Sequence, residues 1–115
     1  MKPLKINLLA FESAVLQSDI PVLLVFGAMW DTDSRMLFSL LDFYGKKLDK
    51  KVKFGIVDYD YVPDIFSQYE VYDIPTMIIF EDGKPFDRRF GYHGSDDIDK
   101  MLHHFFGYLP YSTKF

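Results

Sequence analysis

The residues of this chain that could do chemistry gather in one short segment, MWDTDS, at positions 29–34. The segment follows an uninterrupted apolar run, VLLVF, so we expect it at the carboxyl end of a buried strand. Asp31 and Asp33 could form an acid–base pair or bind a cation. If a helix begins directly after Asp31, its carboxylate instead caps that helix by accepting an amide hydrogen bond from two or three positions later. The cap is the simpler interpretation, and an enzymatic or cation-binding site is the alternative.

Two further residues could complete such a site. Asp73 could join Asp31 and Asp33 around a cation, although the positive end of a helix dipole repels cations. Ser34 could act as a nucleophile only with a base, and His93 is the histidine that could reach the same face. His93 is otherwise expected to be an ordinary loop histidine. The pattern therefore predicts no metal ligand and no cofactor.

Composition limits the classes of function that remain. The 115 residues contain no cysteine, which excludes disulfides, thiolate metal sites and chemistry by thiols of the chain itself. The net charge of −4 differs from the basic field of a nucleic-acid-binding protein. No uncharged run reaches the length that crosses a bilayer. We expect one globular domain without a membrane or nucleic-acid partner, and the lack of cysteine favours the cytoplasm.

Apolar periodicity predicts the elements that must position these residues. Helical spacing covers 8–18, 32–48, 63–68 and 95–106, and strand patterns cover 22–26, 52–60, 76–80 and 86–92. LKIN, at 4–7, is a candidate first strand. Strands that alternate with helices indicate parallel crossovers, whereas EDGK indicates a hairpin that adds an antiparallel strand. The order predicts an α/β sandwich with a mixed sheet.

In this order the segments resemble the thioredoxin family from about residue 9 to 105. FESAVLQSDIPVLLVFGAMW is similar to the family's first helix, central strand and active-site tryptophan, here Trp30. VYDIPT is similar to the loop with the family's cis-proline, here Pro75, and MIIFEDGKPFDRRFGY to its last hairpin, with Gly91 at the family's glycine. The resemblance implies a three-layer α/β/α sandwich with a central mixed β-sheet. We expect a single domain over 1–115, with 106–115 as a C-terminal extension.

The chain departs from the family where the family does its chemistry. Asp31 and Ser34 stand at the positions of the two cysteines of the Trp-Cys-Gly-Pro-Cys motif. By the same alignment, Val25 and Ile56 replace the buried aspartate and nearby lysine of bacterial members, and Ser39 replaces the proline inside the helix. These replacements predict a member without redox activity that is not an enzyme.

The resemblance also implies a groove that binds an extended peptide. The positions that correspond to it are Met29, Trp30, Tyr72, Ile74, Pro75, Gly91 and Tyr92. We therefore predict an adaptor, chaperone or assembly factor that binds a protein or peptide there. The alternatives are the enzymatic or cation-binding site above, and an accessory role in thiol redox pathways through a partner's cysteines. The aromatic tail after residue 105 could also form a homodimer contact.

Overall fold

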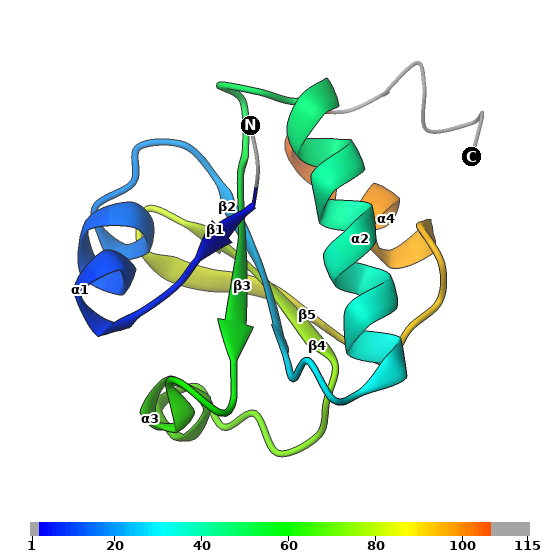
Figure 1. The fold of residues 1–115 in the computed structure, drawn as a ribbon. Coiled ribbons are helices and arrows are strands. Elements are labelled where there is room, and N and C mark those ends of the chain that lie inside the picture. Colours follow the sequence, from blue (N-terminus) through cyan, green and yellow to red (C-terminus); the bar gives the residue numbers. More distant parts are fainter. Residues whose placement is uncertain (1–2, 107–115) are drawn as a thin grey trace.

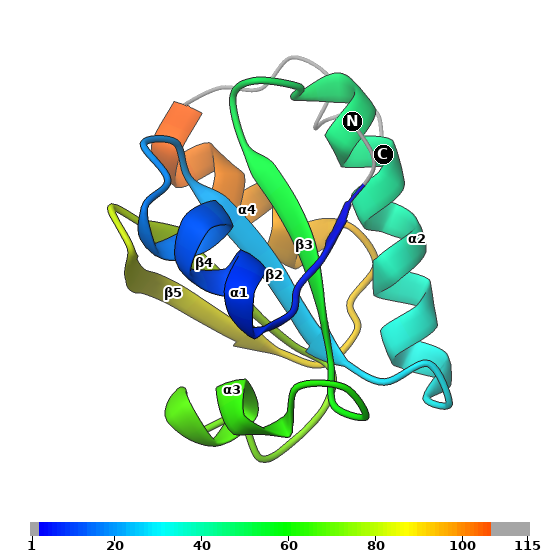
Figure 2. The same cartoon turned by 60° about the vertical axis from the view of Figure 1, so that its left-hand side comes forward.

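The chain folds around one five-stranded mixed sheet, with helices on both of its faces. The structure, a computed structural model, describes residues 3–106. Helices α1 and α3 lie on one side of the sheet, and α2 and α4 lie on the other (Figures 1 and 2). In chain order the elements are β1 (Leu4–Lys5), α1 (Leu8–Ala10), η1 (Phe11–Leu16), β2 (Val22–Gly27), α2 (Thr32–Lys47), β3 (Lys53–Asp58), α3 (Pro63–Gln68), β4 (Thr76–Glu81), β5 (Lys84–Phe90) and α4 (Asp96–Phe106). The predicted α/β/α sandwich is confirmed.

The strand order explains how one end of the sheet becomes a site. The strands lie in the order β1-β3-β2-β4-β5, with β1, β3 and β2 parallel and β4 and β5 antiparallel to their neighbours. Gly27 pairs with Asp58, and Thr76 pairs with both Phe26 and Phe90. The carboxyl ends of β2, β3 and β5 therefore meet the beginning of β4 at a single edge. In open α/β sheets, ligands bind at the carboxyl ends of the strands.

Strand β2 runs through the middle of the core. All six of its residues are buried, which accounts for its apolar sequence without alternation. Leu23 and Val25 face the cluster formed with α2 and α4, and Leu24 and Phe26 face the cluster formed with η1 and α3. Val25 lies opposite Ile56 in the ladder, so an apolar pair occupies this part of the sheet.

The first helix differs from its prediction. One turn of α-helix is followed by a π-helix, η1, in which the Gln17 amide donates to the Glu12 carbonyl oxygen at 3.0 Å. This wider winding places Phe11 and Val15, four residues apart, on the buried face. Leu8 and Leu16 are exposed instead of continuing the apolar stripe that a regular α-helix would give. The predicted single helix over 8–18 is therefore wrong in its winding.

Of the predicted C-terminal extension over 106–115, Phe106 ends α4, and residues 107–115 lie outside the described residues together with any homodimer contact that they could form. Within residues 3–106, none of the helices has the length and apolar character needed to cross a membrane.

Candidate functional site

Asp31 caps helix α2. Its backbone is extended, and its Oδ2 accepts hydrogen bonds from the Ser34 amide at 2.9 Å and from the Ser34 hydroxyl at 2.8 Å. Ser34 is fully buried, and a Cβ on Gly27 would lie only 2.4 Å from its Oγ. The predicted N-cap is confirmed. Because the Ser34 hydroxyl is enclosed between β2 and the cap, it is not placed as an exposed nucleophile.

Trp30 and Met29 form an exposed apolar rim beside this cap. Trp30 is 65% exposed and Met29 is 56% exposed, although both are large apolar side chains. The Trp30 indole Nε1 lies 3.5 Å from Asp60 Oδ1, in the loop after β3. Arg35 donates to the Met29 carbonyl oxygen at 2.7 Å and so fixes the loop between β2 and α2. The two side chains that the sequence placed in a groove are thus available at the surface.

The loop before β4 forms the opposite side of the site. The peptide bond between Ile74 and Pro75 is cis, and Tyr72 is exposed. The Gly91 amide donates to the Pro75 carbonyl oxygen at 2.8 Å, which joins the end of β5 to this loop. Gly91 has a φ of +89°, a conformation that side-chain-bearing residues rarely adopt.

Two of the seven predicted groove residues, Ile74 and Tyr92, are half-buried and pack against the hydrophobic core. Ile74 is half-buried and packs against the cluster on the α3 side of the sheet. Tyr92 is also half-buried and packs against the cluster on the α2 side. Their side chains serve the core in part, so the exposed apolar surface of the groove consists mainly of Met29, Trp30 and Tyr72.

A histidine–aspartate pair adjoins the cis-proline loop. His93 Nδ1 lies 2.7 Å from Asp97 Oδ2, and the two side chains are 59% and 12% exposed. The His93 ring lies against Gly91, because a Cβ built on that glycine would be 3.2 Å from Cε1 and 3.6 Å from Nε2. Since the Gly91 amide is hydrogen-bonded to the Pro75 carbonyl oxygen, the imidazole lies at the edge of the predicted groove. Asp97 Oδ1 also lies 3.8 Å from Arg89 Nη1, within the range of an ion pair.

The sequence indicated His93 only as a possible base for Ser34, and not as the partner of Asp97. The available signal was the spacing of the two residues: His93 lies in the loop before α4, and Asp97 follows four residues later in the first turn of the helix. Ser34 and His93 do not form the nucleophile–base pair that the sequence left as a possibility, since each hydrogen-bonds to a different carboxylate. Among residues 3–106, no three His, Asp or Glu side chains group as metal ligands, so Asp31, Asp33 and Asp73 are not brought together around a cation.

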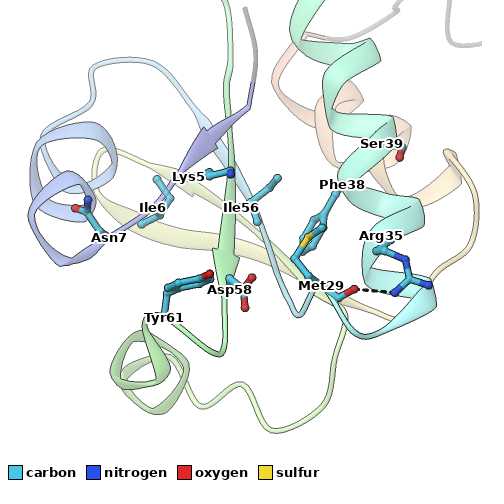
Figure 3. Close-up of a pocket in the computed structure, with 10 residues that line it drawn as sticks. All are labelled: Lys5, Ile6, Asn7, Met29, Arg35, Phe38, Ser39, Ile56, Asp58 and Tyr61. Carbon is cyan, nitrogen blue, oxygen red and sulfur yellow. Dashed lines mark hydrogen bonds between the residues drawn. The ribbon is translucent and has the colours of Figure 1, made fainter.

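A cavity of about 690 Å³ lies beside the site, between β3 and α2 (Figure 3). It extends from Met29, at the rim described above, toward β1. Ile56 and Ser39, at the positions where the family has a lysine and a proline, both line it. The cavity was not foreseen in the sequence.

This chain is similar in sequence to proteins named thioredoxins. A family model described as Thioredoxin matches residues 2–104. A thioredoxin of Rickettsia bellii is 36% identical over 93 residues, covering 81% of this chain and 89% of the relative. A thioredoxin of Rickettsia felis is 38% identical, covering 71% and 78%. Thioredoxin M4, chloroplastic, of Arabidopsis thaliana is 32% identical, covering 83% of this chain and 49% of the relative.

These relatives overturn two predictions. The expected role as an adaptor, chaperone or assembly factor without redox function is contradicted, because the matching proteins are named thioredoxins. The expectation that the chain is not an enzyme is contradicted for the same reason, since thioredoxins are oxidoreductases. The lack of cysteine excludes only sulfur supplied by this chain. It does not affect the alternative that the sequence left open, a role in thiol redox chemistry through a partner's cysteines.

Proposed function

Because this chain belongs to the thioredoxin family, we propose that it promotes thiol–disulfide exchange between cysteines that bound proteins supply. The observation that carries the proposal is the His93–Asp97 pair at the edge of the cis-proline loop. The chain supplies no thiol at the positions of the family motif, where Asp31 and Ser34 stand. Its own part is therefore to hold the reacting sulfur atoms and to exchange a proton with them.

The exposed apolar rim supports binding of a partner segment. Trp30, Met29 and Tyr72 offer aromatic and soft apolar surface of the kind enriched in interfaces. The cis-Pro75 loop and Gly91 form the facing backbone. A segment with a cysteine that lies across this rim would bring its sulfur near the imidazole of His93.

His93 supplies the proton transfer that exchange requires. A free thiol is mainly protonated at neutral pH, and only the thiolate attacks a disulfide. The Asp97 carboxylate can only accept a hydrogen bond, so neutral His93 donates to it from Nδ1 and presents the lone pair of Nε2 to the groove. Nε2 takes the proton of the partner thiol, and the thiolate attacks one sulfur of a partner disulfide. A new disulfide forms, and the departing thiolate takes the proton from the imidazolium.

The carboxylate of Asp31 is compatible with this chemistry. A thiolate at the beginning of α2 would be repelled by a free carboxylate. Asp31 directs its Oδ2 to the amide and hydroxyl of Ser34, so part of its charge is neutralised by the helix. The imidazolium that forms on His93 compensates the charge of the thiolate while the thiolate exists. A cytoplasmic location, where partner thiols stay reduced, remains a prediction that fits this role.

A defined exchange reaction tests the proposal. The substrates are a peptide with one cysteine between two aromatic residues, and oxidised glutathione, and the peptide–glutathione disulfide is measured over time. We expect the wild-type protein to accelerate its formation with saturation in peptide. His93→Gln should remove most of this acceleration, since a general base contributes about 100-fold or more. Trp30→Ala should raise the peptide concentration needed for saturation.

The matched control is His104→Gln. His104 is an exposed histidine of α4 whose ring lies against Phe86, away from Asp97. We expect this variant to retain the wild-type rate. No acceleration by the wild-type protein, or equal rates for the two histidine variants and the wild type, would contradict the proposal.

A further inference from the structure

The cavity between β3 and α2 has the dimensions of a small-molecule site. Its volume of about 690 Å³ lies within the 300–1,000 Å³ typical of ligand pockets. Four parts of the chain enclose it: β1 with the residues after it, the loop after β2, the first half of α2, and β3 with the loop that follows (Figure 3). It is separate from the His93–Asp97 pair, because neither of these residues lines it.

The inner surface of the cavity is apolar. Ile6 and Phe38 are buried and Ile56 is half-buried, and the three come from different elements on its two sides. Met29 and Tyr61 lie at the opening, where the Tyr61 side chain is 81% exposed. An apolar ligand body would therefore be covered by aliphatic and aromatic carbon on both sides, and would extend the burial of Ile56 and Met29.

The charged residues at the opening are unequally engaged. Arg35 donates to the Met29 carbonyl oxygen at 2.7 Å and to Thr32 Oγ1 at 3.3 Å. Asp58 Oδ1 accepts from the Asp60 amide at 3.0 Å. Within residues 3–106 the Lys5 ammonium makes no hydrogen bond or ion pair. Figure 3 shows the Lys5 side chain extending from β1 toward Ile56 of β3.

An unengaged cation beside an apolar cavity matches one class of ligand. We propose that this cavity binds an amphipathic anion, with the apolar chain on Phe38 and Ile56 and the anionic group at the Lys5 ammonium. A cationic head group would approach both Lys5 and Arg35, two like charges at the same opening. A neutral molecule would gain no attraction from the Lys5 ammonium, which is exposed and solvated by water. The Asp58 carboxylate accepts a hydrogen bond from the Asp60 amide and lies on the Tyr61 side of the opening. The anionic group of the ligand is therefore placed on the β1 side, at Lys5.

Three probes of equal chain length separate charge from hydrophobicity. Decanoate, decanol and decyltrimethylammonium are added to the full chain below their micelle concentrations, and binding is followed by chemical shifts of backbone amides. We expect decanoate to bind saturably at one site, with the largest shifts at Phe38, Ile56 and their neighbours, and to bind more tightly than the other two. Equal affinity for the three probes, or shifts that avoid these residues, would overturn the proposal.

Variants test the two parts of the site separately. Ser39→Trp places a large side chain into the cavity from the exposed face of α2 and should abolish decanoate binding. Lys5→Met should weaken decanoate binding about threefold to fivefold and leave decanol binding unchanged, as expected for one charge contact of an exposed lysine. Lys84→Met, on exposed β5 far from the cavity lining, is the matched control. Unchanged decanoate affinity in Lys5→Met would overturn the placement of the anionic group.

A second filling variant keeps the test valid if Ser39→Trp does not fold. Ile56→Phe fills the cavity from the sheet side, and a thermal unfolding curve establishes whether each variant is native. A folded Ile56→Phe protein that binds decanoate as tightly as the wild type would contradict the cavity as the site. None of these measurements depends on His93, so a failed exchange assay and a failed binding assay remain distinguishable.

Discussion

At the scale of single residues, replacing sulfur with oxygen changes what the beginning of α2 can do. Asp31 and Ser34 stand where the family has two cysteines, and here they hydrogen-bond to each other. The Asp31 carboxylate also accepts a hydrogen bond from the Ser34 amide, one of the donors that a helix leaves unsatisfied at its first turn. The positive end of the helix, which would lower the pKa of a thiol, stabilises a fixed carboxylate instead.

This cap predicts a measurable stability. Asp31→Ala removes the acceptor of the Ser34 amide and leaves the buried Ser34 hydroxyl without its partner. We expect the free energy of unfolding in urea to fall by about 0.5–2 kcal/mol. Asp33→Ala is the matched control, because Asp33 lies in the first turn without accepting the cap bond, and its cost should be smaller. Equal losses in the two variants would show that the helix dipole alone, and not the cap bond, stabilises this end.

The sequence predicted the cap, but it could not have predicted the histidine pair as part of a site. A cap depends on neighbours in the chain, so the residues from 29 to 34 were sufficient. The link from His93 to the cis-proline loop passes through Gly91 and the pairing of β4 with β5. Such contacts between segments depend on tertiary packing, which local patterns do not specify. The cavity beside α2 was missed for the same reason.

At the scale of elements, α2 is tied to both the sheet and α4. Gly27 at the end of β2 allows Ser34 of α2 to approach closely, since a Cβ there would lie 2.7 Å from the Ser34 Cβ. Farther along α2, the buried Tyr44 hydroxyl donates to the carboxylate of Asp99 in α4. Element types and most bounds followed from periodicity, whereas the π-winding of η1 did not, because its hydrogen-bond pattern leaves no distinct spacing in six residues.

The contact between α2 and α4 predicts a pH dependence. Burial raises the pKa of Asp99 above its ordinary value of 3.8, the charge of Asp96 raises it further, and the Tyr44 hydrogen bond opposes both. The folded state therefore binds this proton more tightly than the unfolded chain does. The contribution of Asp99 to stability is fully present below pH 3.8 and is lost as pH rises through the raised pKa.

Asp99→Asn isolates this contribution, because asparagine retains an oxygen acceptor for Tyr44 and carries no charge. We expect the stability of the wild type relative to this variant to fall as pH rises above 3.8, and then to level off. Urea unfolding of both proteins across this pH range measures the difference. A difference that is constant with pH, or that changes in the opposite direction, would contradict the raised pKa.

At the scale of the whole molecule, one strand joins two cores. The cluster on the α2 and α4 side and the cluster on the η1 and α3 side are separated by the sheet, and β2 contributes to both. The sequence predicted this arrangement from a single feature, the unbroken apolar run of β2, since only a strand covered on both faces needs one. The site at the sheet end depends on both layers, with Asp31 at the N-cap of α2 and Pro75 in the loop after α3.

If the two cores form one cooperative unit, substitutions on either face of β2 should have the same global effect. Leu23→Ala opens a cavity toward α2 and α4, and Leu24→Ala opens one toward η1 and α3, and both side chains are fully buried. We expect each to lower the free energy of unfolding by about 2–5 kcal/mol. Native-state hydrogen exchange should then show equal losses of protection in β3 and β4 for both variants. Loss confined to the helices of the substituted face would mean that each layer unfolds separately, and that Asp31 and the cis-proline loop are held in place independently.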